Sequence, residues 1–310
     1  MMYGTTNLQR ELQHIVGIGE LLFDVHDQQT SLGGAPVNFS YHAHQLLSQF
    51  GYQGHVVSAV GDDDLGTRAI DELRTAGLTI SSIQHHDTLA TGTARVHSVA
   101  GGHDFEIVEN VSWDSLNWNS SLEALAKITA CVCFGTLGQR HPKSRSTIRH
   151  FIEQCPKALK LFDVNLRQTY FDSETLLHGC QNANILKMSA DEIPLVMKHT
   201  QTPSATDPVK SCQTLLDRFS LDYVIYTAGA DGTTLLTADQ VIRGDHPKVQ
   251  VANAVGAGDA CAAGIITGLL RKLELSHVVD IGNRMGARVA GEDSATCPIP
   301  RELITSWLTS

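Results

Sequence analysis

Short apolar segments typical of β-strands alternate with segments of helical pattern along most of the chain. Two parallel strands need a crossover connection, usually a helix, so this alternation predicts a mainly parallel sheet with helices on both faces. We therefore expect a doubly wound α/β fold in three layers. The expected strands are residues 15–19, 56–60, 130–134, 160–164, 185–188 and 223–226, and the expected helices are residues 37–50, 64–76, 144–153 and 257–272.

Residues 21–32 and 88–112 break this alternation. Strand-like pieces at residues 21–25, 91–99 and 104–111 occur here without helices, and Gly101-Gly102 between two of them indicates a hairpin. Extra antiparallel strands on such a sheet often make a lid or an interface, so we expect a small β-strand lid within these two ranges. Because an exposed strand edge can pair with another chain, the pattern is compatible with a homodimer formed through the lid strands.

Composition limits the number of domains, the classes of binding partner and the cellular location that we expect. The 310 residues contain no linker, repeat or low-complexity tract, so we expect one domain over residues 1–310. The net charge of -10 argues against nucleic acid and anionic membranes, since both recruit clustered Lys and Arg. Cys131 and Cys133 alternate along an expected strand and suit a core. Reduced thiols, with no signal peptide or membrane span in the sequence, predict a cytoplasmic protein.

The segment from Asn253 to Cys261 is the strongest chemical motif. Gly256-Ala257-Gly258 precedes a helix of small residues, where open backbone N–H groups and the helix dipole favour an anion such as phosphate. Asp259 lies inside this anion site. Its charge repels phosphate, so Asp259 is either a general base or an acid that stabilises the helix dipole. The chain has no P-loop and no Gly-x-Gly-x-x-Gly after the first strand, so a dinucleotide site is not indicated.

This motif resembles the second signature of the PfkB, or ribokinase-like, carbohydrate kinase family. Further segments resemble that family in the same order along the chain, and their agreement in order is far more specific than any one of them. The resemblance implies a ribokinase-like fold and transfer of a phosphoryl group to a sugar. The other segments are Gly33-Gly34-Ala35-Pro36-Val37-Asn38, residues 60–66, Phe134-Gly135-Thr136-Leu137, Asp163-x-Asn165-x-Arg167, Thr227-x-Gly229-x-x-Gly232 and residues 283–290.

The resemblance implies a role for each matching residue at the reacting centre. Asp259 would deprotonate the sugar hydroxyl, and the backbone N–H groups of Ala257, Gly258 and Asp259, after Gly256, would form the anion hole. Arg167 would lie near the transferred phosphoryl group, where a fixed planar cation is useful.

Five residues would bind the sugar in this interpretation. Asp24 and Asn38 would form hydrogen bonds with its hydroxyl groups, while Gly33 and Gly34 would let it approach the backbone. Arg95, on an expected lid strand, would either point at the sugar or be a solvated or interface arginine.

The resemblance also implies ATP and Mg²⁺. Lys187 and Glu192 match the family's Lys-x-Asn-x-x-Glu segment, and Glu192 would organise Mg²⁺ through water. Four residues would line the ATP site, namely Thr227, Gly229, Gly232 and Asn283.

Two positions depart from the family pattern. Asn253-Ala254 stands where relatives have Asp-Thr, and in relatives that Asp helps to bind an activating monovalent cation. Asn keeps an oxygen ligand but loses the charge, so we expect weak or no dependence on K⁺. Ser189 replaces an Asn that usually precedes the Mg²⁺-region Glu, and we expect a modest effect there.

The expected substrate is fructose, converted to fructose 6-phosphate. Gly19-Glu20, Gly34-Ala35-Pro36 and the segment 163–168 look more like fructokinases than like ribokinases. A 2-keto-3-deoxygluconate, ribose or nucleoside kinase would carry nearly the same signatures. Two further alternatives are a sugar- or nucleotide-binding protein without turnover and a Rossmann enzyme that is not a kinase.

Overall fold

A nine-stranded central sheet is the main feature of the computed structural model, which describes residues 12–26, 29–99, 102–244 and 246–309. Its strands are β1 (Gln13–Ile18), β4 (Tyr52–Gly61), β5 (Ile83–His86), β8 (Thr129–Phe134), β9 (Leu159–Asp163), β10 (Ile185–Ser189), β11 (Tyr223–Thr227), β12 (Thr233–Leu236) and β13 (Val241–Arg243). They lie in the order β13-β12-β11-β10-β9-β8-β1-β4-β5. In this spatial order, every pair of neighbouring strands between β11 and β5 is parallel. β12 pairs antiparallel with β11, and β13 pairs antiparallel with β12. The mainly parallel sheet is thus confirmed.

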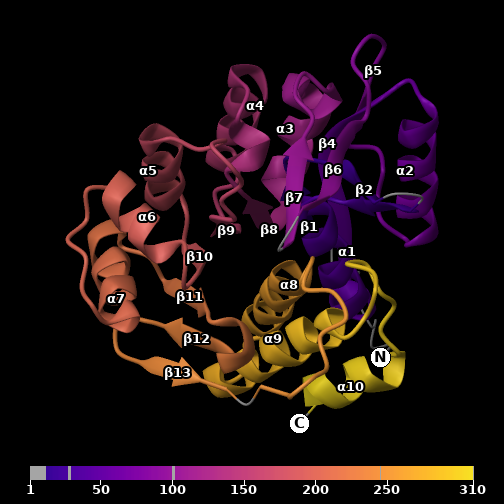
Figure 1. Ribbon diagram of the computed structural model, residues 1–310. Coiled ribbons are helices and arrows are strands. Elements are labelled where there is room, and N and C mark those ends of the chain that lie inside the picture. The colour runs from indigo at the N-terminus through magenta and orange to yellow at the C-terminus, as the bar shows by residue number, and fades with distance from the viewer. Residues whose placement is uncertain (1–11, 27–28, 100–101, 245, 310) are drawn as a thin grey trace, which may run out of the picture.

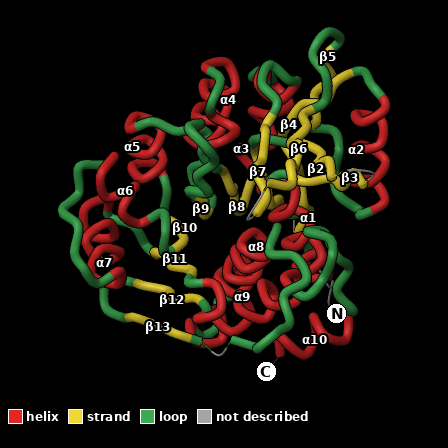
Figure 2. The backbone as a smooth tube through the Cα atoms, viewed as in Figure 1, coloured by secondary structure: helices red, strands yellow, loops and turns green. Residues whose placement is uncertain are grey.

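Helices cover both faces of this sheet, as Figures 1 and 2 show. One face carries α1 (Ala35–Leu47), α2 (Asp64–Thr75), α8 (Ala257–Leu270), α9 (Leu275–Ala290) and α10 (Arg301–Thr309). The other carries α3 (Ser120–Ile128), α4 (Pro142–Glu153), α5 (Ser173–Asn182), α6 (Ile193–His199) and α7 (Pro208–Phe219). No helix within the described residues is long and apolar enough to cross a membrane.

Alternate residues of the strands feed the two cores. On β8, Cys131 and Cys133 pack with α8 and α9, while Val132 and Phe134 pack with α3 to α7. All four side chains are buried. The period of two along a strand explains this division, and it confirms that the two cysteines belong to a core.

A second, four-stranded sheet forms the lid: β2 (Leu22–His26), β3 (Gln29–Gly33), β6 (Gly92–Val99) and β7 (Gly102–Ile107), in the order β3-β2-β6-β7. β6 and β7 form the expected hairpin, whose turn at residues 100–101 lies outside the described residues. The prediction of antiparallel lid strands needs one correction, because β2 and β6 pair in parallel. β2 follows β1 along the chain, and β6 follows β5. Because β1 and β5 run in the same direction, β2 and β6 both start from the edge of the central sheet where the carboxyl ends of its parallel strands lie.

Asp63 connects the central sheet to the lid. Its carboxylate caps α2 by accepting the N–H of Gly66 at 2.7 Å. The same carboxylate accepts the N–H and the hydroxyl of Thr91, at 2.8 and 2.6 Å. One cap residue therefore fixes both the start of a helix and the start of lid strand β6.

Candidate active site

The carboxyl ends of β1 and β8 to β11 meet along one edge of the central sheet. Strand order reverses at β1, which lies between β4 and β8, and ligands of open α/β sheets bind outside the carboxyl ends at such a reversal. Glu20 lies just beyond β1, Asp163 ends β9 and Glu192 lies just beyond β10. This edge therefore gathers ionisable groups where the fold itself favours a ligand.

Asp259 and the predicted anion hole share the first turn of α8. Gly256 caps this helix with a φ of 80°, a left-handed conformation that glycine adopts at little cost. The first N–H groups of a helix lack intrahelical acceptors and carry the positive end of the dipole. The structure thus brings Ala257, Gly258 and Asp259 together at one site.

Asn38 contacts the predicted base directly. It lies in the first turn of α1, and its Nδ2 donates to Oδ2 of Asp259 at 2.8 Å. Its Oδ1 is buried and has no hydrogen-bond partner among the described residues. The sequence predicts Asn38 as a sugar ligand, whereas the structure shows its amide holding the carboxylate of Asp259.

Lys187 lies next to the first turn of α8. Its Nζ donates to both carboxylate oxygens of Asp163 at 2.8 Å, and both side chains are less than 10% exposed. A Cβ added to Gly258 would lie 3.4 Å from this Nζ. Burial alone would lower the pKa of Lys187, but Asp163 and Asp259 raise it above its usual value, so the ammonium stays charged. Lys187 therefore supports the first turn of α8 from below, and the sequence indicates Asp163 only as part of a motif.

Electrostatics suit Asp259 to a role as a base. Burial raises its pKa to about 6, and the charge of Asp163 adds to the rise, while Lys187, Asn38 and Arg167 oppose it. A catalytic base works best when its pKa is close to the working pH. Asp259 is ionised at neutral pH and can still accept a proton.

Glu20 is a second buried carboxyl group beside Asp259, and the sequence indicates it only within Gly19-Glu20. Its Oε1 accepts the N–H of Ala35 at 3.3 Å, and its buried Oε2 has no hydrogen-bond partner among the described residues. Burial raises its pKa to about 7, and the charge of Asp259 adds to this. Glu20 thus contacts the start of α1 through a hydrogen bond and interacts electrostatically with Asp259.

Three of the predicted sugar residues, Asp24, Gly33 and Gly34, lie close to one another, whereas Arg95 lies apart. A Cβ on Gly33 would lie 2.7 Å from Oδ2 of Asp24, and Gly34 caps α1 with a φ of 106°. Asp24, Gly33 and Gly34 therefore lie together, one helical turn from Asn38.

Arg95 does not join that group. Arg95 on β6 is in register with Val25 on β2 and with Glu106 on β7. Asp24 is the residue before Val25, and neighbouring residues of a strand point to opposite faces. Arg95 therefore points to the opposite face of the lid sheet from Asp24. Its side chain is 59% exposed and lies 3.8 Å from the carboxylate of Glu106. Arg95 therefore lies on an exposed face of the lid, away from Asp24.

The segment after β9 carries Arg167 over the site. Asn165 and Gln168 have φ values of 40° and 48°, which are strained for residues with a Cβ and often mark functional segments. Arg167 is exposed, and its charge lowers the pKa of Asp259. Glu192 holds this segment, since its two oxygens accept the N–H groups of Leu166 and Ser189, each at 2.7 Å.

The predicted nucleotide residues lie farther along the same edge. Thr227 ends β11, and Gly229 and Gly232, with φ values of 53° and 79°, form the turn into β12. A Cβ on Gly229 would meet open space. Asn283, on α9, donates to the carbonyl of Gly244 at 3.4 Å.

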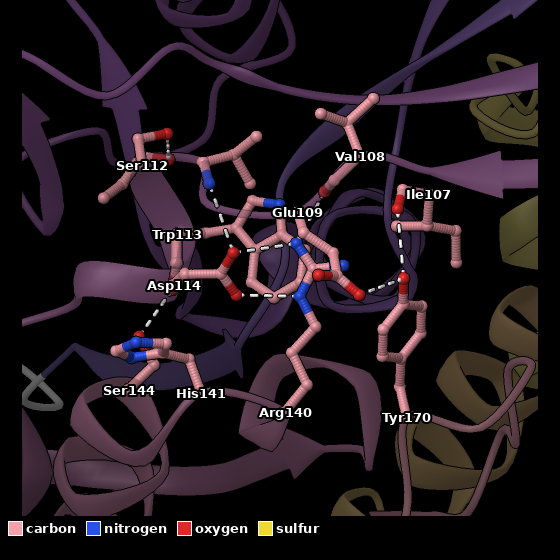
Figure 3. Close-up of polar contacts among 12 residues, drawn as sticks. Ile107, Val108, Glu109, Ser112, Trp113, Asp114, Arg140, His141, Ser144 and Tyr170 are labelled. Atoms are coloured by element: carbon pink, nitrogen blue, oxygen red, sulfur yellow. Dashed lines mark hydrogen bonds and ion pairs between the residues drawn. The ribbon is translucent and has the colours of Figure 1, made fainter.

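Figure 3 shows how the base of the lid is fixed. Arg140 forms a bidentate ion pair with Asp114, at 2.8 Å for each bond, and donates to the carbonyl of Val108 at 2.6 Å. Its guanidinium lies 4.0 Å from the ring centre of Trp113 and 4.9 Å from that of Tyr170. Tyr170 follows the Arg167 segment, so this cluster joins the lid to the part of the site that carries Arg167.

Comparisons with known proteins show what the chain is similar to. A fructokinase from Escherichia coli is 25% identical over 286 residues, which cover 86% of this chain and 88% of that protein. A putative ribokinase II from E. coli in complex with ATP and Mg²⁺ superposes with a TM-score of 0.81 at 20% identity, covering 96% of this chain and 99% of the other. A double mutant of fructokinase from Vibrio cholerae, bound to fructose, ADP and potassium, superposes with a TM-score of 0.78 at 18% identity, with the same coverage of 96% and 99%.

The family model described as "pfkB family carbohydrate kinase" matches residues 1–302. The match spans both the central sheet and the lid, and it includes every residue of the site described above. The resemblance inferred from the motifs is confirmed, as is the ribokinase-like fold. The chain belongs to the pfkB family of carbohydrate kinases.

Proposed function

We propose that the protein transfers the γ-phosphoryl group of ATP to a primary hydroxyl of a small sugar, with D-fructose giving fructose 6-phosphate as the first candidate. One observation carries the proposal. A carboxylate whose pKa is about 6 lies in the same helical turn as the N–H groups of an anion hole. That pairing suits a reaction in which a hydroxyl loses a proton while charge develops on a phosphoryl group.

The transfer is a single displacement. The sugar hydroxyl oxygen attacks the γ-phosphorus, the bond from that phosphorus to the β–γ bridging oxygen breaks, and the hydroxyl proton moves to Asp259. N–H groups of Ala257 and Gly258 stabilise the phosphoryl oxygens, while Asn38 orients the carboxylate through its 2.8 Å hydrogen bond. Arg167 supplies positive charge from the other side. ADP and the sugar phosphate leave, and Asp259 returns its proton to solvent.

ATP would lie along Thr227, Gly229, Gly232 and Asn283, with its phosphates directed to the first turn of α8. Mg²⁺ would neutralise phosphate charge when bound. Glu192 fits the outer shell of such an ion, because each of its oxygens uses one lone pair on a backbone N–H and keeps another for a metal-bound water.

Acidic groups favour a neutral acceptor. Asp24, Glu20 and Asp259 gather around the start of α1, so a sugar that already carries a phosphate would meet repulsion there. Their oxygens suit the hydroxyl groups of a free sugar as hydrogen-bond acceptors. Similarity to a fructokinase supports fructose as the first acceptor to test.

A panel of acceptors with coupled detection of ADP tests the proposal. It should include fructose, ribose, 2-keto-3-deoxygluconate and nucleosides. We expect ADP release that depends on fructose, and we expect Asp259→Asn to lower kcat by about 10²–10⁴-fold, the usual contribution of a general base. No ADP release with any acceptor would favour a binding protein without turnover. Turnover near the wild-type rate in Asp259→Asn would refute the role of Asp259.

A further inference from the structure

Residues 290–297 form a wall beside the anion hole. A Cβ added to Gly256 would lie 2.6 Å from Cβ of Ala295, so Gly256 packs directly on this wall. Because Gly256 caps α8, the position of the wall sets the position of the first N–H groups of that helix. A group that fixes the wall therefore also fixes the anion hole.

Protein N–H donors hold the wall along its length. Its carbonyl oxygens accept N–H groups from α1 and from the segment before α8, so donors rather than a cation occupy the side of the wall that faces these segments. The contacts are Ala252 N to Ala290 O at 2.8 Å, Asn253 N to Ala290 O at 3.2 Å, Asn253 Nδ2 to Asp293 O at 3.3 Å, His42 Nε2 to Ala295 O at 2.8 Å and Gln45 Nε2 to Cys297 O at 3.3 Å.

The orientation of the Asn253 amide is determined by its other contact. Its Oδ1 accepts the backbone N–H of Val255 at 2.9 Å, so the NH₂ group must face the carbonyl of Asp293. A K⁺ ion between these segments would need oxygen ligands, but this geometry directs an N–H donor toward the wall. The residues here do not fit the monovalent cation that the family pattern implies.

We propose that Asn253 is a positioning residue whose amide joins the wall to the start of α8, so that the anion hole keeps its geometry without a monovalent cation. The amide bridges the two segments by donating to one and accepting from the other. This inference rests on the proposed function only for its kinetic readout, since the bridge itself is a property of the fold.

The test compares the wild type, Asn253→Asp and the control Asp293→Asn. Each protein is assayed in a K⁺ salt and in a tetramethylammonium salt at equal ionic strength. We measure kcat and the thermal midpoint of each. Wild type and Asp293→Asn should differ less than about twofold between the salts, because the control keeps the Asp293 carbonyl. Asn253→Asp points a carboxylate at that carbonyl, so its kcat should fall about tenfold or more in tetramethylammonium and recover in K⁺.

The thermal midpoint of Asn253→Asp should rise in K⁺ as well, whereas the midpoints of the other two proteins should not. A merely structural loss would lower activity equally in both salts and would overturn the proposal. Strong K⁺ activation of the wild type would also overturn it. If no acceptor is phosphorylated, the proposed function fails, but the salt dependence of the three midpoints still decides the role of Asn253.

Discussion

The hydrogen bond from Asn38 to Asp259 separates two explanations of the same residue. If Asn38 mainly binds sugar, Asn38→Ala should raise the KM for the sugar and leave the pH dependence of kcat unchanged. If its main task is to hold the base, as the 2.8 Å bond indicates, the substitution should change the pKa of Asp259. The two outcomes appear in different kinetic parameters.

The size of the change follows from the contact. A hydrogen bond to a charged group contributes about 1.5–3 kcal/mol, and about 1.4 kcal/mol corresponds to one pKa unit. The bond stabilises the ionised form, so its loss raises the pKa. We expect the pKa of Asp259 to move from about 6 to about 7–8 in Asn38→Ala. The acid limb of the pH profile of kcat should move upward by one to two units.

The assay is the pH profile of kcat at saturating sugar and ATP. Ser40→Ala is the matched control, because it also removes one buried hydrogen bond from α1, the 2.7 Å bond to the carbonyl of His55. We expect no shift of the acid limb in this control. A higher KM for sugar in Asn38→Ala, with the acid limb where it is in the wild type, would refute the reasoning.

Two further predictions concern the other buried charges. Lys187→Met leaves Asp163 as an unpaired buried anion, so we expect a loss of about 3–5 kcal/mol in the free energy of unfolding at neutral pH, measured by urea denaturation. The double variant Lys187→Met with Asp163→Leu should regain most of it, and a double variant as unstable as the single one would contradict this. The pKa of Glu20 is raised to about 7, so the unfolded chain releases that proton first and stability falls as pH rises from about 4.5 to about 7. Glu20→Gln should lack this fall, worth about 3 kcal/mol, and equal pH dependence of unfolding in both proteins would exclude it.

Residue patterns along the chain predict both the fold class and the chemical centre. Alternation of strand and helix leads to a parallel sheet because the connections must be crossovers. The Gly256 to Asp259 segment reveals the anion site because small residues before a helix leave N–H groups open, a local property. Four of the strands, β3, β5, β12 and β13, are not among the predicted ones, since segments of three to five residues carry little periodicity.

Contacts between side chains, by contrast, depend on how distant segments meet in the folded chain. Asn38 and Asp259 are 221 residues apart in sequence, and their hydrogen bond depends on the packing of α1 against α8. Strand register placed Arg95 on the opposite face of the lid from Asp24, since neighbouring residues of a strand point in opposite directions. Lys187 lies close to Gly258 although the two residues are far apart in sequence, so that a Cβ on Gly258 would lie 3.4 Å from the Lys187 Nζ. Sequence motifs name the residue types that a reaction needs, whereas distances and charge states arise from segments that meet only in the folded chain.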